Sequence, residues 1–174
     1  MREVIERLEV LVQPYYVTGS EALGRYGQPR QTMDLDVVVD IRVAEFASLA
    51  RMFERDFLVN DPLDLGDRSM ASLVAVSGLG KVDLIIGRDD PWARSAMARR
   101  VRWEHPGYGS TWVSSLEDLI LAKLEWSGGS SELQLRDARH LVEGNRAIVD
   151  WPYLERWATV LGVSTTLGAI RAAT

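Results

Sequence analysis

The chain has 174 residues, of which 47% are apolar, and this is enough for one ordinary domain with a core and a helical extension. It contains no cysteine and two histidines, so a bound metal ion is expected to have oxygen ligands. A net charge of −5 argues against a surface built throughout to hold a nucleic-acid backbone. The sequence shows neither an export signal nor eighteen uninterrupted apolar residues, so we expect a cytoplasmic protein without a membrane contact.

The first forty residues predict two helices and two strands. Apolar residues at helical spacing indicate an amphipathic helix over residues 2–12. A short strand, Tyr15-Tyr16-Val17, is followed by the turn Thr18-Gly19-Ser20, which opens a short helix ended by Gly27-Gln28-Pro29. The segment Leu35 to Val39 is almost entirely apolar, which is typical of a strand buried on both faces.

The middle of the chain predicts a helix and a hairpin. Residues 43–58 are expected to be helical. Ser72 to Val76 and Lys81 to Ile86 are two strands, joined across Ser77-Gly78-Leu79-Gly80. A short helix after residue 90 and a strand near 99–103 follow.

From Ser114 onward the pattern is helical. Ser114 and Glu117 have the spacing of a capping box, Gly128-Gly129-Ser130-Ser131 separates two helices, and Asp150 caps a third ahead of Pro152. The sequence therefore predicts an α/β fold. We expect a small mixed β-sheet core flanked by helices over residues 1–113 and a C-terminal helical extension over 114–174, packed as a single compact unit.

Gly19-Ser20 follows a strand and opens a helix, where backbone N–H groups favour an anion such as phosphate. The alternative is that Ser20 only caps the helix.

Asp34 and Asp36 lie two residues apart at the start of an apolar strand, so their side chains share one face. Two carboxylates so placed repel each other unless a cation lies between them, and Mg²⁺ prefers such oxygens. Both could also simply cap the turn before the strand.

Asp83 is a third aspartate in an apolar strand, and a buried carboxylate requires a partner. Lys81 is one candidate partner. A metal ion shared with Asp34 and Asp36 is the other, and in that site Asp83 could also accept the proton of an attacking hydroxyl.

Lys123 falls within the apolar stripe of the helix that begins near Ser114, so its ammonium group is expected to face inward, where it requires an anion. Asp137 lies at the edge of the apolar stripe of the next helix. One interpretation is a salt bridge between these two helices.

Three features in order resemble the signature of the DNA polymerase beta-like nucleotidyltransferase superfamily. They are Gly19-Ser20, then after thirteen residues Asp34-Leu35-Asp36-Val37, and a later strand aspartate, Asp83. The segment from Gly19 to Asp36 resembles in particular the AbiEii-type and MenT-type nucleotidyltransferases of bacterial toxin–antitoxin systems. The resemblance covers roughly residues 15 to 145 and lacks the long C-terminal acceptor-binding region of the larger toxins.

This resemblance implies transfer of a nucleoside monophosphate from an NTP to an acceptor hydroxyl. Asp34, Asp36 and Asp83 would hold two Mg²⁺ ions, and Gly19 and Ser20 would bind the triphosphate. Lys123 would contact phosphates and Asp137 would organise the site. Arg30 is a further phosphate contact or a structural ion-pair partner.

The acceptor stays open between a tRNA end, a protein hydroxyl and a small molecule such as an aminoglycoside. A tRNA acceptor requires a basic surface, for which Arg94, Arg99, Arg100 and Arg102 are the available cluster, although they also fit a solvated helix end and an edge strand. A toxin regulated by a cognate antitoxin fits the resemblance. A non-catalytic binding or regulatory protein is the rival class, and the presence of all three aspartates argues against it.

Overall fold

The computed structural model describes residues 1–78 and 80–173. Its centre is an eight-stranded mixed sheet in the order β3-β5-β6-β2-β1-β8-β7, with β4 pairing β5. The β2–β6 and β1–β8 pairs are parallel and the other pairs are antiparallel. This confirms the predicted α/β class. The strands are β1 Tyr15–Val17, β2 Asp34–Val39, β3 Phe57–Val59, β4 Leu63–Asp64, β5 Ser69–Ala75, β6 Lys81–Ile86, β7 Val101–His105 and β8 Gly109–Val113.

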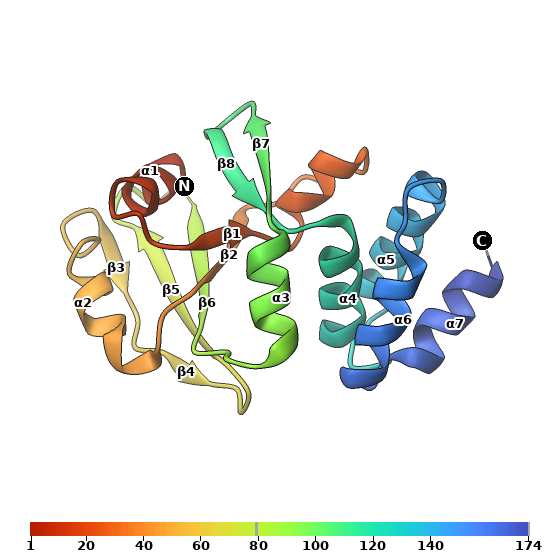
Figure 1. Ribbon diagram of the computed structural model, residues 1–174. Coiled ribbons are helices and arrows are strands. Elements are labelled where there is room, and N and C mark those ends of the chain that lie inside the picture. Colours follow the sequence, from red (N-terminus) through yellow and green to blue (C-terminus); the bar gives the residue numbers. More distant parts are fainter. Residues whose placement is uncertain (79, 174) are drawn as a thin grey trace.

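Helices cover both faces of the sheet. Figure 1 shows α1 and α2 on one side, α3 and α4 on the other, and α5 to α7 stacked beyond α4 toward the C-terminus. The helices are α1 Arg2–Val10, α2 Phe46–Ala50, α3 Pro91–Arg99, α4 Leu116–Trp126, α5 Glu132–Asn145, α6 Trp151–Val160 and α7 Ser164–Ala173, with the short 3₁₀ helices η1 Glu21–Tyr26 and η2 Val43–Glu45. Over the described residues, none of these helices has the length and apolar character needed to cross a membrane.

The central strand β2 is buried on one face only, which corrects the prediction of a strand buried on both. Leu35, Val37 and Val39 are fully buried, whereas Asp34, Asp36 and Val38 on the opposite face keep partial exposure. The face that carries the aspartates therefore lines a cleft.

The helix predicted over residues 43–58 is wrong beyond its first turns. After η2 and α2 the chain turns, and Phe57 enters β3, where it pairs with Ala75 of β5. Phe53 and Phe57 are both buried, and their rings meet edge to face. Their spacing is compatible with a helix, but pairing with β5 determines the conformation.

The hairpin of β5 and β6 is confirmed, and Leu79 of its predicted turn lies outside the described residues. The predicted strand near 99–103 is β7, an edge strand whose partner β8 the sequence pattern did not indicate.

The capping box predicted at Ser114 is displaced by one residue. Ser115 is the N-cap of α4, and its hydroxyl accepts from the amide of Asp118 and donates to the carboxylate of the same residue. Asp150 caps α6 as predicted, since its side chain accepts from the amide of Tyr153. The division of the chain at residue 113 stays a prediction.

Candidate active site

The sheet brings the three predicted aspartates to one end of two neighbouring strands. In the parallel β2–β6 pair, Asp36 lies directly opposite Asp83, and Asp34 lies opposite Lys81. Asp34 is exposed, Asp36 is half-buried and Asp83 is 6% exposed. Carboxylates from separate parts of the chain therefore meet on one face.

Asp83 is held by two protein partners. The hydroxyl of Ser72 donates to its Oδ1 at 2.6 Å, and the ammonium group of Lys81 lies 2.8 Å from its Oδ2. The ion pair proposed from sequence as the alternative for Asp83 is thus present. Within residues 1–78 and 80–173, no three acidic or histidine side chains form a ready-made metal cage.

Asp34 and Asp36 differ from Asp83, because their side chains accept no hydrogen bond and form no ion pair with any described residue. Burial and the neighbouring Asp83 carboxylate raise the pKa of Asp36. Mg²⁺ is commonly bound by one or two carboxylates and completes its shell with water and phosphate oxygens. The unpaired oxygens of Asp34 and Asp36 fit that requirement, and Asp83 would join them by exchanging Lys81 for the ion.

The turn between β1 and η1 touches the carboxylate of Asp36. Gly19 has a φ of +64°, and a β-carbon added there would lie 1.9 Å from Asp36 Oδ2. Ser20 makes no side-chain capping bond to η1, so its predicted alternative role as a cap is wrong. Its hydroxyl instead accepts a hydrogen bond from Arg30.

A chain of polar contacts runs from this turn to the helical extension. Arg30 lies 3.9 Å from Asp137, and Lys123 donates to Asp137 at 3.0 Å. Lys123 is 3% exposed, and burial lowers its pKa. The interhelical salt bridge is therefore present. The Nε atom of Arg30 is also buried and has no hydrogen-bond partner in the described part of the chain, so it is a donor open to an anion.

One cleft between the sheet and α4, with a volume of about 150 Å³, is lined by Gly19, Ser20, Asp36 and Lys123. Arg30 and Asp137 line a separate pocket, and Asp34 and Asp83 line neither of the two. Gln134 and Trp126 also line the cleft, and sequence reasoning missed both. The Oε1 atom of Gln134 is buried without a partner among the described residues. Neither residue stands out from the ordinary helical pattern around it. The principal lining residues are Gly19, Ser20, Asp36, Lys123, Trp126 and Gln134.

The predicted basic cluster is largely committed to internal contacts. Arg99 donates to Glu117 at 2.7 Å and lies over the ring of Tyr153. The other three arginines are engaged as well: Arg94 with Asp89, Arg100 with the carbonyl of Met97 and the ring of Trp112, and Arg102 with Glu9. The contacts of these four arginines therefore favour a helix end followed by an edge strand over a basic surface for tRNA.

The fold resembles those of solved nucleotidyltransferases. A nucleotidyltransferase-like protein from Paracoccidioides brasiliensis superposes with a TM-score of 0.58 at 16% identity, covering 97% of this chain and 88% of that one. The antibiotic-resistance factor ANT(2″)-Ia gives 0.58 at 13% identity, over 98% and 90% of the two chains. The lincosamide antibiotic adenylyltransferase LnuA, solved with lincomycin, gives 0.55 at 13%, over 80% and 92%.

No family model matches the sequence, and no curated protein sequence matches it either. At these identities the structural similarity establishes the nucleotidyltransferase fold, and the residues of the site must support any statement about the reaction.

Proposed function

We propose that the chain is a metal-dependent nucleotidyltransferase, which moves a nucleoside monophosphate from an NTP to an acceptor hydroxyl. The observation that carries this proposal is the pair Asp34 and Asp36, unpaired on one strand face, beside the Gly19 turn and opposite Asp83. A fold used only for binding has no need to keep these carboxylates together and uncompensated, because their mutual repulsion lowers its stability.

The triphosphate of the donor lies against the Gly19-Ser20 turn in this proposal. Its oxygens accept from the free Nε of Arg30 and from Lys123, which share Asp137 as their carboxylate partner. Two cations that share one carboxylate leave net positive charge for the phosphates.

Asp34 and Asp36, joined by Asp83, would hold Mg²⁺, which supplies positive charge to the phosphates and to the developing transition state. The acceptor oxygen forms a bond to the α-phosphorus while the bond from that phosphorus to the bridging oxygen breaks. Pyrophosphate leaves, and the hydroxyl proton passes to a carboxylate oxygen of Asp83. Lys81, released from Asp83, stays close enough to offset the charge of Asp34, which lies opposite it.

The assignment to the AbiEii-type and MenT-type group, a toxin role on tRNA and a cognate antitoxin rest on the sequence motif and stay predictions. The same holds for the cytoplasmic location. The paired state of Arg94, Arg99 and Arg102 argues against tRNA, because an RNA backbone requires free cationic side chains.

Calorimetric titration with α,β-methylene-ATP, an analogue whose α-phosphorus cannot be transferred to an acceptor, tests the site directly, and the other NTP analogues extend it to donor choice. We expect Mg²⁺-dependent binding that is lost in Asp36→Ala. Asp40→Ala is the matched control, because Asp40 is an exposed carboxylate just beyond the same strand. Equal binding by the wild type and Asp36→Ala would contradict the assignment.

A further inference from the structure

A cavity lies on the same sheet face as the aspartates. It has a volume of about 320 Å³ and lies between the sheet and α3. Thr18, Ile85, Ala122 and Trp126 line both this cavity and the cleft that contains Asp36. The two spaces are therefore neighbouring parts of one depression.

The cavity begins two residues further along β2 and β6 than the carboxylates of Asp36 and Asp83. Val38 and Ile85 line it, and they are the next residues after Asp36 and Asp83 on the same face. Side chains on one face of a strand repeat about every 7 Å. A molecule with a single ring in the cavity can thus place a hydroxyl beside Asp36 and Asp83.

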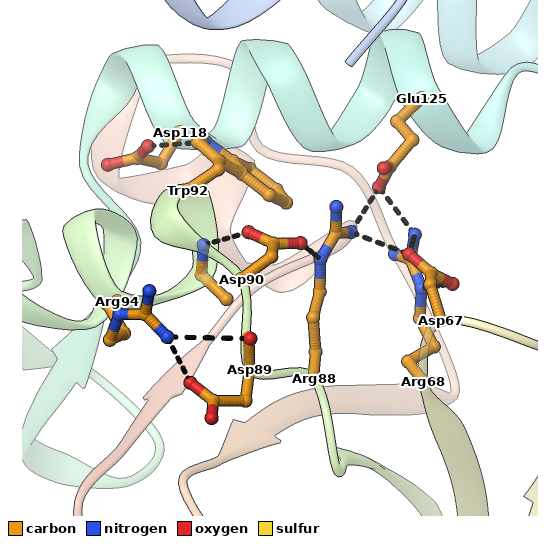
Figure 2. A network of polar contacts seen from close by, with 10 residues as sticks. Asp67, Arg68, Arg88, Asp89, Asp90, Trp92, Arg94, Asp118 and Glu125 are labelled. Atoms are coloured by element: carbon orange, nitrogen blue, oxygen red, sulfur yellow. Dashed lines mark hydrogen bonds and ion pairs between the residues drawn. The ribbon is translucent and has the colours of Figure 1, made fainter. Parts of the chain in front are cut away.

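Two of the four arginines that line the cavity, Arg68 and Arg88, have their charge neutralised. Figure 2 shows the guanidinium groups of Arg68 and Arg88 turned toward Glu125, each with a nitrogen 2.8 Å from its Oε2. Asp67 pairs with both arginines, and Asp90 lies 2.5 Å from Arg88. Three carboxylates surround these two cations, so this part of the wall does not select a phosphate-rich ligand.

Much of the remaining lining is apolar or aromatic. Tyr16 and Trp92 are buried, and Trp92 donates its ring N–H to Asp118, which fixes the indole against the cavity. Met97 and Ala93 line the α3 side. Apolar walls with a few fixed polar groups are typical of small-molecule sites, and the volume lies within their usual range of roughly 300–1,000 Å³.

We propose that this cavity binds the apolar body of a small acceptor molecule, whose hydroxyl extends into the adjoining cleft to receive the nucleotide. The proposal rests on the proposed nucleotidyl transfer and names its acceptor class: a compact, hydroxyl-bearing molecule with an apolar ring, neither a nucleic acid nor a polyanion. The shared lining residues and the neutralised arginines carry it.

Binding can be measured without catalysis by following the indole N–H signals of ¹⁵N-labelled protein in NMR spectra. The probe is cyclohexylmethanol, and myo-inositol is the polar ring of similar size. We expect cyclohexylmethanol at millimolar concentration to shift the Trp92 and Trp126 signals saturably, and myo-inositol to leave them unchanged. Saturating Mg²⁺ and α,β-methylene-ATP should leave the shift in place, because donor and acceptor bind together.

Ala93→Phe fills the cavity and should weaken probe binding at least tenfold. Ala147→Phe adds the same side chain at an exposed position and should have no effect. Met97→Trp, which fills the cavity from another position on α3, gives a second test should Ala93→Phe fail to fold.

Three results would overturn the proposal: no saturable shift, an equal shift in Ala93→Phe, or displacement of the probe by the nucleotide analogue. A shift of the same signals by total tRNA, with none by cyclohexylmethanol, would assign the surface to RNA instead.

Binding of α,β-methylene-ATP is measured separately, from the amide signals of Gly19 and Ser20. If nucleotide binds and the alcohol does not, the acceptor proposal alone fails; if nucleotide does not bind, the transfer reaction fails and the acceptor proposal fails with it.

Discussion

Gly19 approaches Asp36 so closely that a β-carbon at position 19 would lie 1.9 Å from Oδ2 and 2.7 Å from Cγ of the carboxylate. The contact joins the turn after β1 to a side chain near the start of β2. Real β-carbons do not occur at such distances, so glycine is required both for this approach and for the φ of +64°. The turn and the carboxylate therefore form a single structural unit.

Substitution of Gly19 by alanine tests that unit. The left-handed backbone alone costs about 1 kcal/mol, and displacement of the Asp36 carboxylate should in addition abolish Mg²⁺-dependent nucleotide binding. Gly27→Ala is the matched control, since Gly27 has a φ of +78° with open space around its missing β-carbon. Denaturant unfolding and nucleotide titration should show similar backbone costs in both variants and a binding defect in Gly19→Ala alone. Equal binding in the two would show that the contact with Asp36 is dispensable.

Asp36→Asn should stabilise the free protein at neutral pH. Because the pKa of Asp36 is raised in the folded state, the folded protein keeps the Asp36 proton at pH values above the ordinary pKa of 3.8. The free energy of unfolding therefore falls as the pH rises from 3.8 through the raised pKa. Removing the charge should raise the free energy of unfolding at pH 7, and the gain should shrink toward pH 3.8. Unfolding curves across pH check this, with exposed Asp40→Asn as the control. A loss of stability at pH 7 would mean that the Asp36 charge is compensated in the free protein.

The Lys123–Asp137 pair should serve both structure and ligand binding. Lys123→Met leaves a buried carboxylate without its closest cation and should cost about 3 kcal/mol. Adding Asp137→Leu should recover most of that stability, because a buried ion pair is often replaceable by apolar residues. Nucleotide affinity should stay low in the double variant. Its recovery along with stability would assign Lys123 a purely structural role.

The N-terminus of α4 offers a test of the displaced cap. Ser115→Ala removes the bond to the Asp118 amide and should destabilise the protein by about 1 kcal/mol. Ser114→Ala should be neutral or slightly stabilising, because the Ser114 hydroxyl is buried with no hydrogen-bond partner among the described residues. Thermal unfolding of the two variants side by side gives the answer. The reverse order would place the cap at Ser114.

The α/β class and the placement of the aspartates follow from local rules that sequence carries. Alternation along a strand places Asp34 and Asp36 on one face, and an apolar strand around Asp83 requires a partner for it. The inward orientation of Lys123 follows from its position in an apolar helical stripe.

Other features depend on contacts between distant segments. Tertiary contacts determine three of these features. They are the register that sets Asp36 opposite Asp83, the pairing of Phe57 with β5 and the ion pair of Arg99 with Glu117. No pattern local to residues 43–58 shows that β5 is available as a strand partner. The cavity beside α3 is likewise formed by residues from several elements, none of which signals it alone.

The central claim is that these carboxylates support nucleotidyl transfer. The most direct measurement incubates the chain with Mg²⁺ and each α-labelled NTP, with total tRNA or a small-molecule extract as acceptor, beside the Asp34→Asn, Asp36→Asn double variant. We predict label on a small molecule, with pyrophosphate released, from the wild-type chain alone. No transfer to any acceptor together with no Mg²⁺-dependent nucleotide binding would contradict the account and favour a non-catalytic protein with this fold.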